Sequence, residues 1–357
     1  MPEIISVATI DLPYKTDQNE LKKFAREVFS TSFEDIERLL ESFDNAKISS
    51  RNLCVPVEYF FSGKTFQEKN ALYIELSLKH SIAAIEDCLK KAVVNKNQIT
   101  DLIFISTTGI ATPSIDALII NEMKLNPDIN RTPVWGLGCA GGVAGIAKAN
   151  TAALANPKAM VLLVAVELCS LTFLKNDLSK SNFIATGIFS DGVAAVLIKG
   201  NEATDDHKLK KSIRIIDSRS KLYYDSLDVM GWEILNTGFK VIFSKDIPAI
   251  VNKNVHADII QFLDKHDLKI SDIKNFVVHP GGTKVIEAYI NALSIDPMIL
   301  NNTCEILNQY GNMSSTTVLY VLNKFIEGSF ENGYGLMMSL GPGFSSEMVL
   351  LKFDNGS

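Results

Sequence analysis

The sequence is poor in cysteine, and its thiols do not lie at the spacings of a metal site. The chain has five cysteines and no C-x-x-C or C-x-H motif, so zinc or another bound metal is not expected. An odd number of scattered thiols does not suit a disulfide framework either. We therefore predict a metal-free protein in a reducing compartment, the cytoplasm. The five are Cys54, Cys88, Cys139, Cys169 and Cys304.

Long apolar runs and basic clusters are also missing. The longest uninterrupted apolar run, residues 159–166, is much shorter than the roughly 20 residues of a membrane-spanning helix. Residues 1–14 lack the basic and then apolar pattern of a signal peptide. The formal net charge is −6, without a basic cluster, which argues against binding to nucleic acid. These absences predict no integral membrane segment and no nucleic-acid partner.

The chain does have enough apolar material for a large core. At 357 residues and 46% apolar content, it suits one compact two-lobed α/β unit better than two separate domains. The polar stretch 201–211 is the best candidate for a joint, which predicts an N-terminal half, 1–205, and a C-terminal half, 206–357. Periodicity predicts helical segments at 21–43 and 71–94, and buried strands at 101–106, 161–166, 193–198, 276–278, 335–340 and 347–351.

Cys139 lies among small residues just before a predicted helix. Residues 135–145 read Trp-Gly-Leu-Gly-Cys-Ala-Gly-Gly-Val-Ala-Gly, and the alanine-rich segment 143–154 is expected to be helical. The positive end of the helix dipole, with its unpaired N–H groups, favours thiolate over thiol. Small neighbours would let a substrate carbonyl reach the sulfur. Taken alone, however, such a cysteine is more often a small buried hydrophobic residue.

Two later loops change that interpretation. His279 follows a short apolar strand and begins a Pro-Gly-Gly turn, and Asn312 lies on a Gly-Asn-Met-Ser-Ser loop that leads into an apolar helix. Singly, His279 could be a satisfied turn histidine and Asn312 a helix cap. Cys, His and Asn that are distant in sequence but each at the end of an element form the pattern of a thiol acyl-transfer site. We therefore predict that Cys139, His279 and Asn312 are the catalytic residues.

Over nearly its whole length the chain resembles the type III polyketide synthases, the chalcone and stilbene synthase family of the thiolase-like superfamily. The resemblance implies a five-layered αβαβα fold of two similar halves, usually a homodimer, with the nucleophile in the first half and the histidine and asparagine in the second. Its substrates would be acyl-CoA and malonyl-CoA, and no cofactor would be needed. The matching blocks are 106–110, 138–142, 166–173, 189–195, 279–282, 311–315 and 341–344.

The chemistry expected from this resemblance begins with an acyl group moving from coenzyme A to Cys139. His279 would hold Cys139 as a thiolate in an ion pair. Malonyl-CoA would then lose CO₂, and the resulting enolate oxygen would be stabilised by His279 and by the side-chain amide of Asn312. The enolate carbon would attack the Cys139 thioester and lengthen the chain by two carbons. No metal, nicotinamide or phosphopantetheine arm is implied.

The resemblance also assigns residues around the substrate. Phe189 matches a gatekeeping phenylalanine between the coenzyme A tunnel and the reaction cavity, while Val241 replaces a second one and leaves more room. Trp232 stands where plant chalcone synthases have a small residue that shapes the cyclisation cavity. Glu167 is predicted to be buried and hydrogen-bonded, either ordering water for cyclisation or serving the structure. The other predicted substrate-binding residues are Thr112, Thr172, Gly281, Ser314 and Gly343.

The departures from the plant pattern resemble the bacterial branch that makes alkylpyrones and alkylresorcinols from fatty acyl-CoA starters. The coenzyme A phosphates need cations, for which Arg51, Lys47 and Lys64 are available. Three other readings stay open. They are a β-ketoacyl synthase III enzyme that makes a single condensation, a non-catalytic scaffold of the same fold, and a thiol hydrolase.

Overall fold

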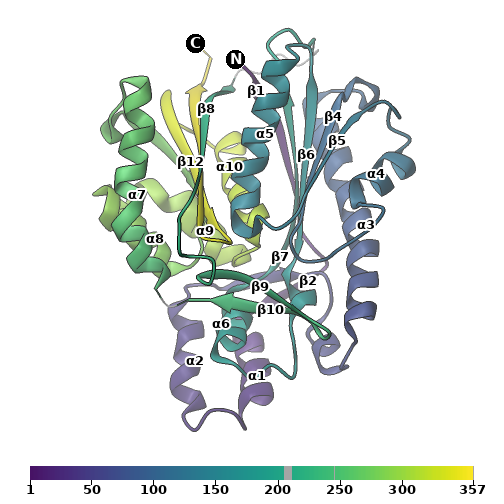
Figure 1. Ribbon diagram of the computed structural model, residues 1–357, viewed down its shortest axis with the longest axis vertical. Helices are drawn as coiled ribbons and strands as arrows, with labels where there is room; N and C mark the ends of the chain where they lie inside the picture. Colours follow the sequence, from purple (N-terminus) through teal and green to yellow (C-terminus); the bar gives the residue numbers. More distant parts are fainter. Residues whose placement is uncertain (205–210, 245, 357) are drawn as a thin grey trace.

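The computed structural model describes residues 1–204, 211–244 and 246–356. Figure 1 shows an α/β molecule. Its strands are β1 Glu3–Ile10, β2 Tyr14–Asp17, β3 Ser50–Leu53, β4 Asp101–Ile105, β5 Asn130–Val134, β6 Met160–Leu168, β7 Asp191–Lys199, β8 Ser212–Leu222, β9 Met230–Leu235, β10 Gly238–Phe243, β11 Ile273–Val278, β12 Gly333–Gly341 and β13 Ser345–Asp354. Its α-helices are α1 Gln18–Phe29, α2 Ile36–Asn45, α3 Phe66–Ala92, α4 Ile115–Met123, α5 Gly141–Ala155, α6 Lys180–Ile188, α7 Ile247–Leu263, α8 Thr283–Leu293, α9 Asn301–Tyr310 and α10 Thr317–Glu327.

One mixed sheet runs through both halves of the molecule. In the described residues it has nine strands in the order β11-β12-β13-β8-β1-β7-β6-β4-β5. The first half supplies one wing, from β5 to β1, and the second half supplies the other, from β8 to β11. The wings meet through the short antiparallel pairing of Glu3 and Ile4 with Arg214 and Ile213. The predicted boundary between residues 205 and 206 lies outside the described residues.

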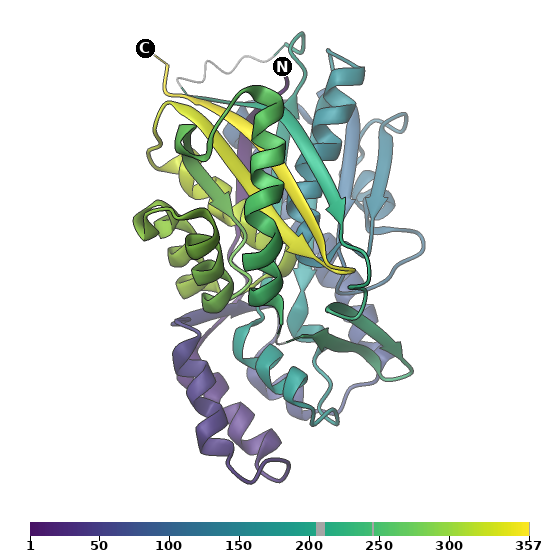
Figure 2. The ribbon, with the colours of Figure 1, turned by 60° about the vertical axis from the view of Figure 1, so that its left-hand side comes forward.

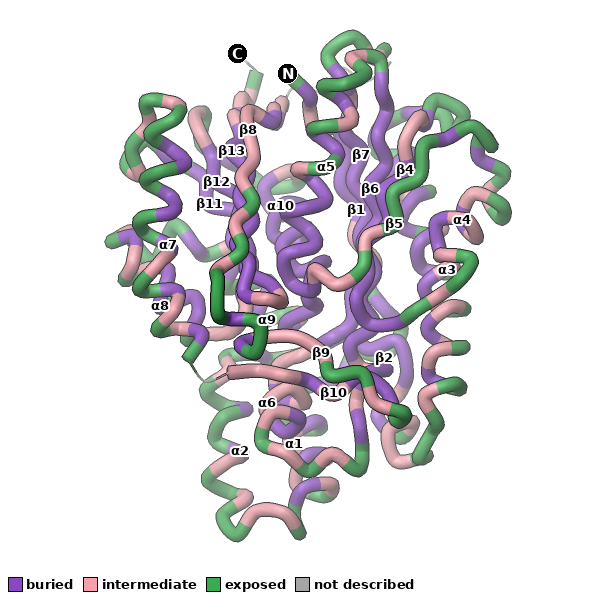
Figure 3. The backbone as a smooth tube through the Cα atoms, viewed as in Figure 1, coloured by how far each residue is buried: buried purple, intermediate pink, exposed green. Residues whose placement is uncertain are grey.

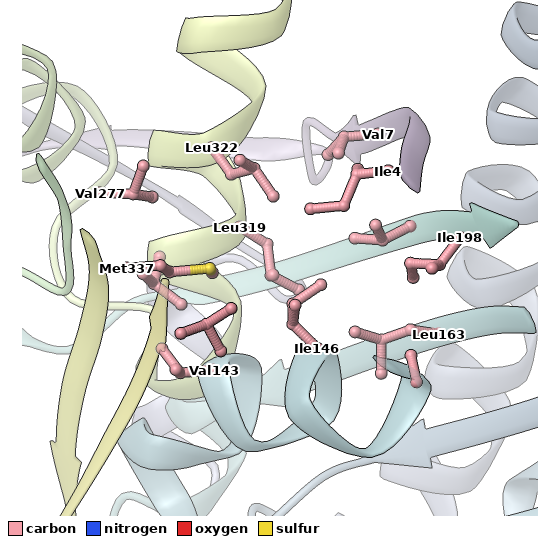
Figure 4. Packing of buried hydrophobic residues seen from close by; sticks show 14 of the residues in the cluster. Ile4, Val7, Val143, Ile146, Leu163, Ile198, Val277, Leu319, Leu322 and Met337 are labelled. Carbon is pink, nitrogen blue, oxygen red and sulfur yellow. The ribbon is translucent and has the colours of Figure 1, made fainter. Parts of the chain in front are cut away.

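Helices fill the space between the wings and cover their outer faces. Helices α5 and α10 lie between the wings in Figure 1, where α5 contacts β6 and β13 and α10 contacts β1 and β11. Because alternate strand residues point to opposite faces, Val277 and Met337 pack on this central layer (Figure 4), whereas Phe276 packs toward α7 and α8. Helix α3 covers the outer face of the first wing. These layers are those of the predicted thiolase-like fold.

A smaller helical layer lies below the sheet and frames the site. Figure 2 shows α1, α2 and α6 there beside the β9–β10 hairpin, and Figure 3 shows that the outward sides of α1 and α2 are exposed. The single helical segment predicted at 21–43 is wrong, because the chain forms two helices with a break at residues 30–35. Asp35 starts the second helix by accepting a hydrogen bond from the Arg38 N–H, an N-cap that interrupts the apolar pattern.

The predicted buried strands are all present, and most extend a few residues beyond the predicted ends. The helix predicted at 71–94 is α3, which begins five residues earlier at a Thr65–Glu68 capping box. Within the described part of the chain, no helix combines the length and apolar character needed to cross a membrane. Among the same residues, no group of three or more His, Cys, Asp or Glu side chains is arranged to hold a metal ion.

Candidate active site

Cys139 lies at the N-terminal end of α5, as the sequence predicts. It sits in a single 3₁₀ turn, Gly138–Ala140, that runs directly into the helix, and its side chain is buried, with the residue 7% exposed. Gly138 has φ +46°, a left-handed conformation that favours glycine. Gly142 allows a close approach to the loop of Asn312, because a Cβ at that position would lie 2.2 Å from the Ser315 carbonyl oxygen. The glycines thus let this turn lie against the loop from the second half.

His279 lies at the end of β11, where its N–H donates to the Met338 carbonyl of β12 at 2.9 Å. The residue is 3% exposed, and neither ring nitrogen has a hydrogen-bond partner among the described residues. Burial lowers the pKa of His279 to about 3. The ring is therefore a neutral imidazole with unused polar atoms, which is costly unless a ligand satisfies them.

Asn312 contacts the segment around Phe189 through its backbone, and the turn after His279 and the sulfur of Cys139 through its side chain. Its N–H donates to the Ile188 carbonyl at 2.9 Å, and its carbonyl accepts from Ser190 at 2.8 Å, so its backbone is paired beside Phe189. Its Nδ2 donates to the Gly281 carbonyl at 3.2 Å, in the turn that follows His279. Its Oδ1 lies 4.0 Å from the sulfur of Cys139.

Ser314 completes the surroundings of the sulfur. Its N–H donates to Asn312 Oδ1 at 2.8 Å, and its hydroxyl lies 3.7 Å from the sulfur of Cys139. Its φ of +52° is unusual for a residue with a side chain. The structure therefore places Ser314 and Asn312 beside Cys139, and Gly281 beside Asn312.

No hydrogen bond joins the two partners of the predicted thiolate–imidazolium pair in this structure. Neither ring nitrogen of His279 bonds to the sulfur of Cys139, and burial raises the pKa of Cys139 to about 12. The helix end and the two hydrogen-bonding neighbours do not outweigh the loss of water around the sulfur. Burial thus disfavours the charged form of both groups, the thiolate of Cys139 and the imidazolium of His279.

Glu167 is fully buried and hydrogen-bonded, as predicted. One carboxylate oxygen accepts from the Thr107 N–H and the Thr108 hydroxyl, each at 3.0 Å, and the other accepts from the Ser315 hydroxyl at 2.6 Å. The Thr107 hydroxyl in turn accepts from the Gly138 N–H at 3.0 Å. Burial raises the pKa of Glu167 to about 7. This carboxyl thus connects the turn of Cys139 to the loop of Asn312.

Four of the predicted substrate-binding residues line one narrow cavity of about 60 Å³: Phe189, Thr172, Trp232 and Val241. Its other walls include Leu21, Phe24, Phe60, Cys169 and Phe173. Phe189 is one of the cavity walls and its backbone pairs with that of Asn312, so the cavity lies next to the loop beside Cys139. The walls are mainly apolar and aromatic, which suits an apolar substrate chain.

Arg51 is not where the sequence interpretation put it. The predicted contact with coenzyme A phosphates is wrong, because Arg51 is 1% exposed and its guanidinium is used inside the protein. One nitrogen donates to the Thr186 and Phe189 carbonyls at 2.7 and 2.9 Å, and another donates to Gln18 Oε1 at 2.5 Å. The position of Arg51 in the segment expected to bind coenzyme A did not indicate whether its side chain is exposed. Its burial depends on the packing of α1 and α6.

Three other predicted residues lie apart from the cavity walls. Thr112 is exposed on the loop before α4 and lines no described cavity, and Lys47 is exposed on the loop after α2. Gly343 has φ +72° in the turn between β12 and β13. That turn supports the site directly, because neighbouring Gly341 lies where a Cβ would come within 2.5 Å of the Ala140 Cβ.

Sequence reasoning missed Cys169, Phe24 and Phe60 as cavity residues. Cys169 lies inside a block that matched the family, so its position beside Thr172 could have been read from that block. Phe24 was identified only as part of an apolar helix face, and Phe60 was not singled out. Nothing in the local sequence says which cavity an apolar side chain will line.

The fold and the assembled site define an acyltransferase of the thiolase-like class. Two family models, those of the chalcone and stilbene synthase N-terminal and C-terminal domains, match residues 60–202 and 217–353. The chain therefore belongs to the chalcone and stilbene synthase family, the type III polyketide synthases. It is a transferase that works by decarboxylative condensation.

Individual relatives agree over the full length. A Bacillus subtilis protein named "Putative chalcone synthase" is 44% identical, with 100% of each chain covered. The 1,3,6,8-tetrahydroxynaphthalene synthase of Streptomyces peucetius is 32% identical over 98% of this chain and 93% of its own. The crystal structure of the corresponding synthase from Streptomyces coelicolor, a bacterial type III polyketide synthase, superposes with a TM-score of 0.92 at 27% identity over 99% of each chain.

Proposed function

We propose that this polyketide synthase loads a fatty acyl group from coenzyme A onto Cys139, extends it with malonyl-CoA more than once, and cyclises the product to an alkylpyrone or alkylresorcinol. The observation that carries the proposal is the unpartnered imidazole of His279, buried with Cys139 and Asn312 beside an apolar cavity. The named Streptomyces relatives make tetrahydroxynaphthalene, so the starter and product need their own support. That support is the apolar wall and the valine at position 241.

Loading requires a proton to leave Cys139 as its sulfur attacks the thioester carbonyl. Because burial favours the neutral form of both groups, His279 acts as the base at that moment: one ring nitrogen takes the thiol proton while the carbon–sulfur bond to coenzyme A breaks. The leaving coenzyme A thiolate takes this proton from His279, which returns the ring to its neutral form. The products are an acyl thioester on Cys139 and free coenzyme A.

Extension uses the same two partners as hydrogen-bond donors. Malonyl-CoA loses CO₂, and the negative enolate oxygen accepts from the single N–H of neutral His279 and from the Asn312 amide. Only one of the two amide hydrogens of Asn312 is used by the Gly281 carbonyl. Loss of one such donor typically lowers the rate by about 10²–10³. The enolate carbon then attacks the Cys139 thioester carbonyl, the carbon–sulfur bond breaks, and the Cys139 thiolate takes up a proton from water. The lengthened chain is now on coenzyme A, and it is loaded onto Cys139 again for the next cycle.

Two partners complete the proposal. Lys47 is assigned to the coenzyme A phosphates, because its loop accepts hydrogen bonds from Thr283, in the segment that follows the His279 turn. Lys64 is instead paired with Glu68.

We also propose a homodimer. Its support is the edge strand β5 and the exposed apolar side chains of Trp135 and Ile110, 47% and 45% exposed.

The test is a panel of acyl-CoA starters from acetyl to stearoyl with isotope-labelled malonyl-CoA, read by product mass. We expect fatty starters to gain two or more labelled C2 units and to close to pyrone or resorcinol products. One added unit would instead indicate a β-ketoacyl synthase III activity, and release of unextended acid would indicate a hydrolase. If the protein neither extends nor hydrolyses any starter and carries no acyl group, it would be a non-catalytic scaffold.

A further inference from the structure

Three phenylalanines from distant parts of the chain meet at the wall of the cavity. Phe24 comes from α1, Phe60 from the 3₁₀ helix Val57–Phe61, and Phe173 from the residue after the 3₁₀ turn Cys169–Thr172. The ring centroids are 5.8 Å apart for Phe24–Phe60, 5.4 Å for Phe24–Phe173 and 5.9 Å for Phe60–Phe173, all edge to face. Each ring therefore touches both others in the preferred aromatic geometry, forming a closed cluster.

This cluster lies between two spaces of very different size. All three rings line the narrow cavity of about 60 Å³ that also contains Phe189. Phe60 and Phe173 also line a groove of about 600 Å³ on the other side. The groove walls include further apolar groups, Phe66, Leu174 and Leu235, and four lysines, Lys64, Lys69, Lys175 and Lys240, with one acid, Asp177.

A buried cation lies on the groove side of the cluster. Lys69 is 8% exposed, and its ammonium donates to the Phe173 carbonyl at 2.9 Å. This bond fixes the backbone of Phe173. The rings therefore lie between the cavity, whose cation Arg51 is bonded to carbonyl groups inside the protein, and a groove lined by four lysines.

We infer that Phe24, Phe60 and Phe173 form a partition that sets the upper length of the acyl starter. The inference rests on the proposed fatty acyl substrate and names the residues that select within that class. A chain bound to Cys139 passes Phe189 into the cavity and ends at the rings. A longer chain can continue into the groove only if a ring is displaced, which breaks its edge-to-face contacts with the other two.

The matched variants are Phe60→Ala and Phe61→Ala. Phe61 lies on the same short helix and contacts Phe24 at 5.0 Å, but it lines neither the cavity nor the groove. Both changes remove a ring next to Phe24, whereas only Phe60→Ala removes part of the partition. Phe60→Leu is a milder change for the case in which the alanine variant does not fold.

The measurement is kcat/KM for a short and a long acyl-CoA starter in each protein, with products identified by mass. We expect Phe60→Ala to raise the long-to-short ratio at least about tenfold, an amount equal to about 1.4 kcal/mol of transition-state binding. Phe60→Leu should raise it less, and Phe61→Ala should leave it at the wild-type value. The partition would be overturned if the long-to-short ratio were the same in Phe60→Ala as in Phe61→Ala. If Phe60→Ala does not fold, Phe60→Leu takes its place in this comparison.

Failure of the proposed function has a different signature. In that case the wild-type enzyme extends no fatty starter at all. The partition is then tested by binding of nonreactive alkyl-thioether analogues of acyl-CoA to the same proteins. The long-to-short affinity ratio is expected to rise in Phe60→Ala only, and an unchanged ratio would again overturn the partition.

Discussion

At the residue scale, burial sets the protonation of the two reacting groups. Loss of water disfavours whichever form is charged, so it raises the pKa of Cys139 to about 12 and lowers that of His279 to about 3. Both shifts favour the neutral pair. We therefore expect the neutral thiol to predominate when no substrate is bound, with deprotonation accompanying attack on the thioester.

The alkylation rate of Cys139 tests this resting state. Because the thiolate is the reactive form, we expect the rate with iodoacetamide to rise with pH by up to about tenfold per unit between roughly pH 7 and 9. Peptide mass mapping would follow Cys139 separately from the other thiols. A rate that is already at its plateau below neutral pH would show that a stable ion pair with His279 exists after all.

Glu167 gives a second pH dependence, in stability rather than rate. Its folded pKa of about 7 lies above the usual 4.5. The stability linked to Glu167 is therefore fully present below about pH 4.5 and is lost as pH rises through 7. Over that range the loss is at most about 3 kcal/mol, from 1.36 kcal/mol per pKa unit.

The Glu167→Gln variant removes this titration. We expect the difference in unfolding free energy, variant minus wild type, to become more positive between pH 5 and pH 8. The altered hydrogen bonds add a contribution to this difference that does not change with pH. Urea unfolding at several pH values measures the difference. A difference that does not vary with pH would mean that Glu167 keeps an ordinary pKa in the folded protein.

At the element scale, the end of α6 is held by side chains from elsewhere in the chain. Its last carbonyls lack partners within the helix, and Arg51 supplies donors to Thr186 and Phe189 while Gln18 supplies one to Gly187 at 3.1 Å. Phe189 follows immediately and pairs with Asn312. Arg51 is thus a positioning residue for the boundary between the cavity and the reacting groups.

Removal of this cap should affect both stability and catalysis. Arg51→Met leaves the Thr186 and Phe189 carbonyls without their donor, and we expect a loss of about 2–4 kcal/mol in unfolding free energy. The kcat should fall more than KM rises, and Arg51→Lys should restore part of it. Arg26→Met, at an exposed pair with Glu37, is the matched control and should behave like wild type. Equal effects in the two methionine variants would refute the positioning role.

At the scale of the whole molecule, the site exists only where the two halves meet. The turn of Cys139 from the first half lies beneath the β12–β13 turn of the second. Gly341 fits there because it has no side chain: a Cβ would lie 2.5 Å from both the Ala140 Cβ and the Leu137 carbonyl oxygen. The position of Cys139 therefore depends on how closely the halves approach.

Gly341→Ala tests this dependence. The added methyl must push the Cys139 turn away, and a displacement of about 1 Å in a reacting group can cost about 10²-fold in rate. Gly231→Ala is the control, since a Cβ there meets nothing within 4 Å. We expect condensation activity to fall sharply in the first variant only. Wild-type activity in a folded Gly341→Ala protein would contradict the close approach of the halves.

The sequence predicted whatever depends on local pattern. Alternating and continuous apolar runs located the strands, and the loops of Cys139, His279 and Asn312 were recognisable from their glycines and their place before or after an element. The break after α1 also had a signal, since the Ser30–Ser32 run and Asp35 are poor helix interior and good cap residues. This signal was overlooked because the apolar residues keep the helical spacing through both α1 and α2.

What the sequence could not show depends on packing between distant segments. In the sequence Arg51 resembles a phosphate ligand, but in the structure the packing of α1 and α6 buries it. The rings of Phe24, Phe60 and Phe173 come from three separate segments, and no local pattern indicates that they meet. The prediction of a Cys139 thiolate took no account of burial for the same reason, because a helix end is visible in the sequence whereas the exclusion of water around the sulfur is not.

The most direct test of the whole account is to trap the acyl enzyme. Wild type, Cys139→Ala and the control Cys169→Ala are each incubated with a fatty acyl-CoA without malonyl-CoA, and peptide masses are measured. We expect an acyl adduct on Cys139 in wild type and in Cys169→Ala, and neither adduct nor extended product in Cys139→Ala. An adduct on another residue, with normal extension by Cys139→Ala, would contradict it.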